Sequence, residues 1–163
     1  MRTYCSLFDS ASLCFSKGLS TPVGSVIVGS TKFIQKANHF KKAFGGGIRN
    51  PGILSAACLV SLEEVMPRIE GTHRLAKELA DRIVEVGYTL TLPVETNMIW
   101  IDLERLGVSE KTFQLYGAEH GVTLFDYNRI VVHHQTSREA VDKLVKAMEQ
   151  LMKDVKNGSV KQA

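Results

Sequence analysis

The chain has 163 residues, 44% of them hydrophobic, and a formal net charge of +3 at pH 7. This composition suits one globular domain, or pieces of two, with a sizeable core. The weak charge, without an arginine-rich stripe, argues against nucleic-acid binding, and the longest apolar runs are too short to span a membrane.

The chain opens with two segments that are typical of buried strands. An apolar run at 11–16 and a β-branched run at 23–28 flank a connection that is too short for a helical crossover, so we expect antiparallel neighbours. Lys17 lies in this connection. Two short strands do not form a stable sheet alone, and we expect them to pair with strands that this chain does not contain.

Apolar periodicity and capping signals predict helices along the rest of the chain. Ser30, Ser109 and Ser137 are expected N-caps, and Gly87 and Gly121 are expected helix stops. The predicted helices span 31–43, 51–65, a segment that ends near 86, 109–120 and 137–155, with further strands at 88–92, 97–103 and 129–134.

The character of the sequence changes after Gly87, where strand-like segments begin. We expect the second part to be a small α+β unit with its own core. Its tail after Asn157 is expected to be frayed.

The three cysteines are an odd number without CxxC spacing, so we expect neither a zinc site nor a disulfide framework. Cys14 and Cys58 lie in apolar runs and are expected to be buried thiols. Reduced thiols and an N-terminus without a signal segment predict a cytoplasmic protein.

The strongest chemical signal is the turn-rich segment around Lys17. A lysine that forms a Schiff base needs a short loop that aims its amine into a desolvated pocket. Gly18 would let a flat cofactor approach the backbone. Alternatively, Lys17 is a strand-end lysine whose charge simply reaches solvent, and the residues alone leave both interpretations open.

A second signal is the glycine run 45–47, which follows Lys42 and precedes Arg49. A glycine run beside cations that opens a helix can bind an anion such as phosphate. The simpler interpretation is a helix stop followed by a loop. Asn50 and Pro51 then predict the cap and the first residue of the next helix.

Four motifs occur in the order S-K-G-L-x-T-P-V-G-S, K-x-x-G-G-G-x-R, T-N-M-I-W-I-D-L and N-R-I-V-V-H-H. Together they resemble the low-specificity threonine aldolases, which are fold type I enzymes that depend on pyridoxal 5′-phosphate (PLP). The resemblance covers nearly the whole chain but only the C-terminal half of a family member. It implies an α/β protein, with the end of the PLP-binding large domain in residues 1–65 and a small α+β C-terminal domain in residues 66–163.

The resemblance also implies roles for four side chains. Lys17 corresponds to the lysine that holds PLP, and Lys42 and Arg49 correspond to cations near the cofactor phosphate and the substrate. Arg129 corresponds to the arginine that binds the substrate carboxylate, a bidentate task that suits a guanidinium. No metal site is implied.

The chain departs from the family pattern at three positions. Ser20 replaces a usual glycine at a loop position that we expect to need a positive φ. Asn50 and Pro51 replace a glutamine and a small residue. The part of the family sequence that carries the phosphate loop, the histidine that stacks on the cofactor ring and the aspartate at its ring nitrogen is not contained in these residues.

Two functions of different classes follow. The first is a PLP-dependent aldehyde-lyase that cleaves a β-hydroxy-α-amino acid such as threonine to glycine and an aldehyde. The intact enzyme would be a homo-oligomer, a dimer or a tetramer. The alternative is a non-catalytic remnant that acts as a dimerisation or interaction module.

Overall fold

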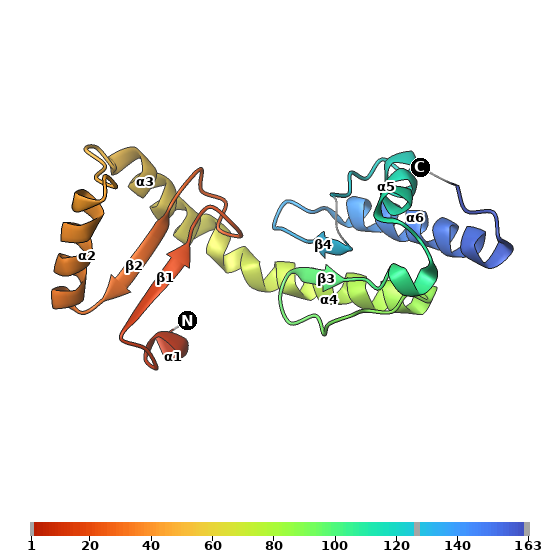
Figure 1. Ribbon diagram of the computed structural model, residues 1–163, viewed down its shortest axis with the longest axis horizontal. Helices are drawn as coiled ribbons and strands as arrows, with labels where there is room; N and C mark the ends of the chain where they lie inside the picture. The colour runs from red at the N-terminus through yellow and green to blue at the C-terminus, as the bar shows by residue number, and fades with distance from the viewer. Residues whose placement is uncertain (1, 126–127, 162–163) are drawn as a thin grey trace. The chain divides into compact units, whose positions relative to one another are not determined.

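The computed structural model describes residues 2–125 and 128–161. The chain divides into two compact units, unit 1 (Met1–Arg68) and unit 2 (Ile69–Ala163), and Figure 1 labels the elements of both. None of the helices in the described ranges is both long and apolar enough to cross a membrane.

Unit 1 combines a two-stranded sheet with helices. Its elements are α1 (Arg2–Cys5), β1 (Ser10–Cys14), β2 (Ser25–Gly29), α2 (Thr31–Ala43) and α3 (Gly52–Val60). A π-helical turn over Ser61–Val65 and a 3₁₀ turn over Met66–Arg68 follow α3. β1 and β2 pair antiparallel, with Ser10 opposite Gly29 and Cys14 opposite Ser25, which confirms the predicted pairing.

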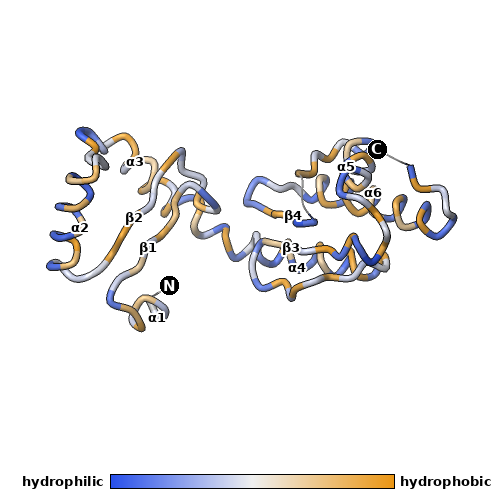
Figure 2. The backbone as a smooth tube through the Cα atoms, in the orientation of Figure 1, coloured by the Kyte–Doolittle hydropathy of each residue, from blue (hydrophilic) through white to orange (hydrophobic). Residues whose placement is uncertain are grey.

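The strands of unit 1 are not buried, contrary to the expectation. All five residues of β2 are exposed, and β1 is at most half-buried. Figure 2 shows apolar residues along β2, where Val26, Ile27 and Val28 keep 38%, 51% and 41% of their surface exposed. Apolar composition alone does not bury a strand, because burial requires covering layers on the faces of the sheet.

The helix starts of unit 1 agree with the predicted caps in one case of two. Ser30 caps α2 as predicted, because its Oγ accepts a hydrogen bond from the Phe33 amide at 3.3 Å. The N-cap of α3 is Pro51 and not Asn50, and no side chain caps this end. The Pro51 carbonyl accepts from the Ser55 amide at 2.8 Å. Proline can take this position because an N-cap contributes its carbonyl and not its amide.

Unit 2 combines three α-helices with a short antiparallel ladder. Its elements are α4 (Ile69–Val86), β3 (Met98–Trp100), α5 (Glu110–Glu119), β4 (Arg129–Val131) and α6 (Arg138–Asn157), with a 3₁₀ turn at Glu104–Leu106. β3 and β4 pair with Ile99 opposite Ile130. The strand predicted at 88–92 is reduced to one bridge, Leu90 opposite Ile101. Pro93 follows it and has no amide hydrogen for a longer ladder.

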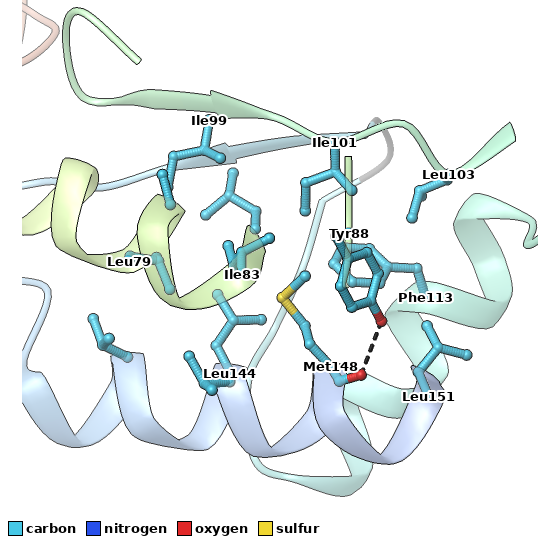
Figure 3. Close-up of a cluster of buried hydrophobic side chains, with 14 of the residues drawn as sticks. Leu79, Ile83, Tyr88, Ile99, Ile101, Leu103, Phe113, Leu144, Met148 and Leu151 are labelled. Atoms are coloured by element: carbon cyan, nitrogen blue, oxygen red, sulfur yellow. Dashed lines mark hydrogen bonds between the residues drawn. The ribbon is translucent and has the colours of Figure 1, made fainter. Parts of the chain in front are cut away.

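The core of unit 2 lies between α4, α6 and the ladder, as Figure 3 shows. Leu79 and Ile83 of α4, Ile99 of β3, and Leu144 and Met148 of α6 are buried there. Fully burying an aliphatic side chain of this size contributes about 1.5–3 kcal/mol. Every buried residue of this cluster belongs to unit 2, so the unit has a core of its own.

The predicted serine caps and glycine stops of unit 2 are confirmed, and α6 ends at Asn157, two residues beyond the predicted end. Ser109 and Ser137 each accept a hydrogen bond at 3.1 Å from the amide three residues further along the chain. Gly87 and Gly121 follow α4 and α5 with φ values of 113° and 73°. Glycine adopts this left-handed region at little cost, which explains the stops.

The C-terminal tail is anchored and not frayed, so that prediction is wrong as far as Lys161. The Tyr116 hydroxyl donates to Asp154 Oδ2 at 2.6 Å, and its oxygen accepts from the Lys161 amide at 3.2 Å. Lys161 Nζ lies 2.6 Å from Glu119 Oε2. The Lys161 contacts join the tail to α5, and the Tyr116–Asp154 bond joins α5 to α6. The local sequence does not reveal that these segments lie close together.

Candidate cofactor and substrate site

Lys17 lies on the turn that joins β1 to β2. The Ser20 amide donates to the Lys17 carbonyl at 2.8 Å, and the Thr21 amide donates to the Phe15 carbonyl at 3.0 Å. Phe15 and Leu19 are only 4% and 7% exposed, whereas Lys17 is exposed. The turn therefore buries its apolar side chains and fixes the backbone of an accessible lysine.

The conformation of Ser20 confirms the expectation from the family pattern. Its φ is 58°, the only positive φ among the described residues other than glycine. The left-handed region costs an L-residue about 1–2 kcal/mol, so the surrounding contacts must hold the turn. One of them is long-range: the buried Ser61 hydroxyl donates to the Leu19 carbonyl.

Ser61 begins the π-helical turn that follows α3. Such turns insert one extra residue into a helix and occur frequently at functional sites. Because the Ser61 hydroxyl reaches the Lys17 turn, the end of α3 and the β1–β2 connection form one hydrogen-bonded structure. Sequence reasoning missed this contact, since nothing in the spacing of the two segments indicates it.

The thiol of Cys14 lies next to this turn and is exposed. The prediction that it is buried is wrong, because β1 leaves it uncovered. A hydrogen bond with Ser16 Oγ, 3.5 Å from Cys14 Sγ, is the main cause that lowers the pKa of the Cys14 thiol below its usual value. The Lys17 charge acts in the same direction. Cys58, the other predicted buried thiol, is half-buried.

The residues of unit 1 do not enclose Lys17 in the desolvated pocket that we expected. The side chain is exposed, and a Cβ added at Gly18 would meet no atom within 4 Å. A side chain at position 18 would therefore meet open space. The pocket is missing because the described part of unit 1 provides no layer over this end of the sheet.

The glycine run ends α2 in a Schellman motif. The Gly46 amide donates to the Lys41 carbonyl at 2.7 Å, and the Gly45 amide donates to the Lys42 carbonyl at 3.1 Å. Gly45 has the expected positive φ of 79°. Two of the three glycine amides are thus occupied, and α3 begins only at Gly52. The run closes a helix and does not open one, which agrees with the helix-stop interpretation.

Lys42 and Arg49 therefore reach an anion only through their side chains. Lys42 lies in the last turn of α2, where the helix dipole favours a cation, and both side chains are exposed. Neither Lys42 nor Arg49 takes part in the ion pairs found between described residues. The donor set fits PLP in its chemistry, since an accessible amine suits an aldehyde and unpaired cations suit a phosphate.

Arg129 lies at the start of β4 and is exposed. Its Cζ lies 5.4 Å from the centroid of the Trp100 ring, and Trp100 is its cross-strand partner in the ladder. A guanidinium that stacks by its face keeps its N–H edge for a carboxylate. Sequence reasoning missed this contact, because it depends on the register of two strands that are far apart in the chain.

The motifs correspond to a known family. Over residues 1–105 the chain matches the sequence profile of the beta-eliminating lyases. A low-specificity L-threonine aldolase of Candida albicans is 42% identical over 149 residues, which are 91% of this chain and 40% of that protein. The alanine racemase TOXG of Cochliobolus carbonum is 37% identical over 161 residues, 94% of this chain and 41% of that protein.

The fold agrees with this relationship. The solved structure of a proposed L-allo-threonine aldolase from Listeria monocytogenes has a TM-score of 0.72 at 22% identity, over 91% of this chain and 46% of that one. The chain spans about two fifths of the length of the curated relatives named above. The profile match, the motifs and the shared α/β fold show that the chain belongs to the beta-eliminating lyase family.

Proposed function

We propose that this chain supplies the cofactor lysine and the substrate arginine of a PLP-dependent lyase that cleaves threonine, or another β-hydroxy-α-amino acid, to glycine and an aldehyde. The observation that carries the proposal is Lys17, an exposed lysine on a turn that hydrogen bonds and the strained Ser20 hold in place. The threonine aldolase that is 42% identical to this chain supports the reaction.

The same proposal assigns the two parts of the chain. Residues 1–65 would be the end of the PLP-binding large domain, and residues 66–163 would be the small C-terminal domain. The division into two compact units at Arg68 supports a boundary close to this point. The separate core of unit 2 supports its role as a domain.

PLP, when bound, supplies an aldehyde for the substrate amino group and a ring that accepts electrons from the substrate Cα. Lys17 would hold the cofactor through its amine, and Lys42 and Arg49 would attract its phosphate. Arg129 would bind the substrate carboxylate through two N–H groups and so orient Cα. The turn of Lys17 keeps its backbone in place while the amine moves.

Lys17 is tested by chemical labelling. Borohydride treatment of the PLP-loaded protein should attach the cofactor irreversibly to Lys17, where peptide mapping would find it. Lys17→Ala should remove both the label and nearly all lyase activity. Lys32→Ala, which removes an exposed lysine of α2, is the matched control and should change neither. A label on any other lysine would contradict the assignment.

Arg129 is tested by kinetics. Losing one partner of a charge-assisted pair costs about 2–5 kcal/mol, so Arg129→Ala should lower kcat/KM for threonine by at least about 30-fold. Cofactor labelling at Lys17 should persist. Arg74→Ala, which removes an exposed arginine of α4, should leave kcat/KM unchanged. An unchanged kcat/KM in Arg129→Ala would refute the carboxylate role.

Because one relative is named an alanine racemase, the lyase assay is paired with a measurement of optical rotation on L-alanine. Release of glycine and aldehyde from threonine supports the lyase. Racemisation of alanine without aldehyde release would show that the reaction is a racemisation and not the proposed cleavage. The role proposed for Lys17 would be unaffected by this result.

A second candidate function is an interaction module. The exposed apolar side chains of β2 favour it: Val26 and Val28 lie on one face of the strand and Ile27 lies on the other, and exposed apolar surface marks interaction sites. Sedimentation of the purified chain with and without PLP distinguishes the candidates. Self-association of the chain without any PLP label on a lysine would support the interaction module and would contradict the proposed lyase.

A further inference from the structure

We propose that Trp100 is a positioning residue, whose indole ring holds the Arg129 guanidinium in the orientation that binds the substrate carboxylate. The inference rests on the proposed function of Arg129 and adds a second residue to it. Trp100 would act through Arg129, without contact with the reacting atoms. The observation behind it is the guanidinium over the ring, with Cζ 5.4 Å from the ring centroid.

The register of the ladder brings the two side chains together. The Ile101 amide donates to the Asn128 carbonyl at 2.8 Å, which makes this a hydrogen-bonded pair. Hydrogen-bonded and non-hydrogen-bonded pairs alternate along antiparallel strands, so the next pair, Trp100 opposite Arg129, is not hydrogen-bonded. Pairs of this kind have their Cα atoms only about 4.5 Å apart and their side chains closest together.

Both side chains lie on the outer face of the ladder. Ile99 and Ile130 are buried on the inner face, and side chains alternate between faces along a strand. Trp100 and Arg129 therefore share the face that turns away from the core of unit 2. Side chains on this face can contact a ligand without a change in the packing of the core.

The backbone beneath the pair is fixed. Asn97 donates from its side-chain Nδ2 to the Val132 carbonyl at 2.8 Å, and its carbonyl accepts from the Val132 amide at 2.9 Å. These two bonds fix the end of the ladder next to the pair of Met98 and Val131. A slip of one residue would turn Ile99 and Ile130 out of the core, so the register is strongly specified.

A fixed ring under a flexible arginine reduces the freedom that binding must otherwise remove. A free arginine side chain loses about 2 kcal/mol of rotamer entropy when it is immobilised. The ring limits this freedom before the substrate arrives. A guanidinium that lies over an aromatic ring by its face keeps its N–H edge available for a carboxylate. An aliphatic side chain at position 100 would fill space but would not attract the cation.

The stacking is tested with the fluorescence of Trp100, the only tryptophan in the chain. A guanidinium on the ring attracts iodide and repels caesium, so both quenchers are compared on the purified 163-residue chain. Arg129→Ala should lower the ratio of iodide to caesium quenching by roughly twofold or more. Arg129→Lys should lower it less, and the control Arg74→Ala should not change it. Equal ratios in the wild type and Arg129→Ala would overturn the inference, whatever the activity.

The positioning role is tested by kinetics on the PLP-loaded enzyme. Trp100→Leu should raise KM for threonine by roughly two- to fivefold with little change in kcat, and Trp100→Phe should restore most of the loss. Circular dichroism checks folding, and Trp100→Met replaces Trp100→Leu, with the same expectations, if the latter does not fold.

The outcomes separate the two proposals. A wild-type KM in Trp100→Leu, together with a large loss in Arg129→Ala, would overturn the positioning role alone. No loss in Arg129→Ala would overturn the function proposed for Arg129. A loss in Trp100→Phe as large as in Trp100→Leu would show that size, and not the aromatic face, matters, which also contradicts the inference.

Discussion

Replacing Tyr116 with phenylalanine tests whether the hydrogen bonds of its hydroxyl, which join α5 to α6 and to the C-terminal tail, stabilise unit 2. The Tyr116 hydroxyl is buried and donates to the Asp154 carboxylate at 2.6 Å, and it also accepts from the Lys161 amide. A hydrogen bond to a charged group contributes about 1.5–3 kcal/mol. Tyr116→Phe should therefore lower the free energy of unfolding by about this amount, and the melting temperature by at least about 6 °C.

The assay uses urea unfolding of the full chain followed by the fluorescence of Trp100, which reports on unit 2 because β3 belongs to that unit. Tyr88→Phe is the matched control. Tyr88 is equally buried, but its hydroxyl donates to the neutral Met148 carbonyl at 2.9 Å, as Figure 3 shows. Its loss should cost only about 0.5–1.5 kcal/mol. A Tyr116→Phe loss no larger than that of Tyr88→Phe would refute the stabilising role of the Tyr116–Asp154 hydrogen bond between α5 and α6.

Two further predictions concern pH and local stability. Burial is the main cause that raises the pKa of both Tyr88 and Tyr116 above the usual value of about 10. The folded chain therefore binds these two protons more tightly than the unfolded chain does. The stability that they contribute is complete below about pH 10 and is lost as the pH rises further. Urea midpoints of the wild type should fall above about pH 10, and the double variant Tyr88→Phe/Tyr116→Phe should show a flatter profile; equal profiles would contradict this. Hydrogen exchange should be fast in β1 and β2 and slow in α4 and α6, because only the latter cover a core; strong protection of β2 in a verified monomer would disprove it.

Local signals predicted the helices well because capping depends on neighbouring residues. Ser30, Ser109 and Ser137 each accept an amide hydrogen bond at the start of the predicted helix. The positive φ at Ser20 was also predictable, since a position that usually holds glycine indicates a left-handed backbone. The caps are decided within a few residues, so the local sequence contains the necessary information, whereas the expectation for Ser20 depends on the resemblance to the family.

Features that depend on distant segments could not be predicted. The burial expected for β1 and β2 requires layers that the described part of unit 1 does not provide. The stacking of Arg129 on Trp100 requires the register of β3 against β4. The anchoring of Lys161 by Tyr116 requires the tail to return to α5. Apolar periodicity reveals which residues tend to be buried, but not what covers them.

The role proposed for Arg129 would place substrate binding and core packing on opposite faces of the β3–β4 ladder. Met98 and Val131 flank the Trp100–Arg129 pair on the outer face and keep 37% and 46% of their surface exposed. Substitutions there would alter the surroundings of Arg129 without opening a cavity in the core. The relatives of this segment carry the names of a threonine aldolase and an alanine racemase. A lineage could therefore vary the outer face while the inner isoleucines stay in place, and change which substrate is held while the same fold persists.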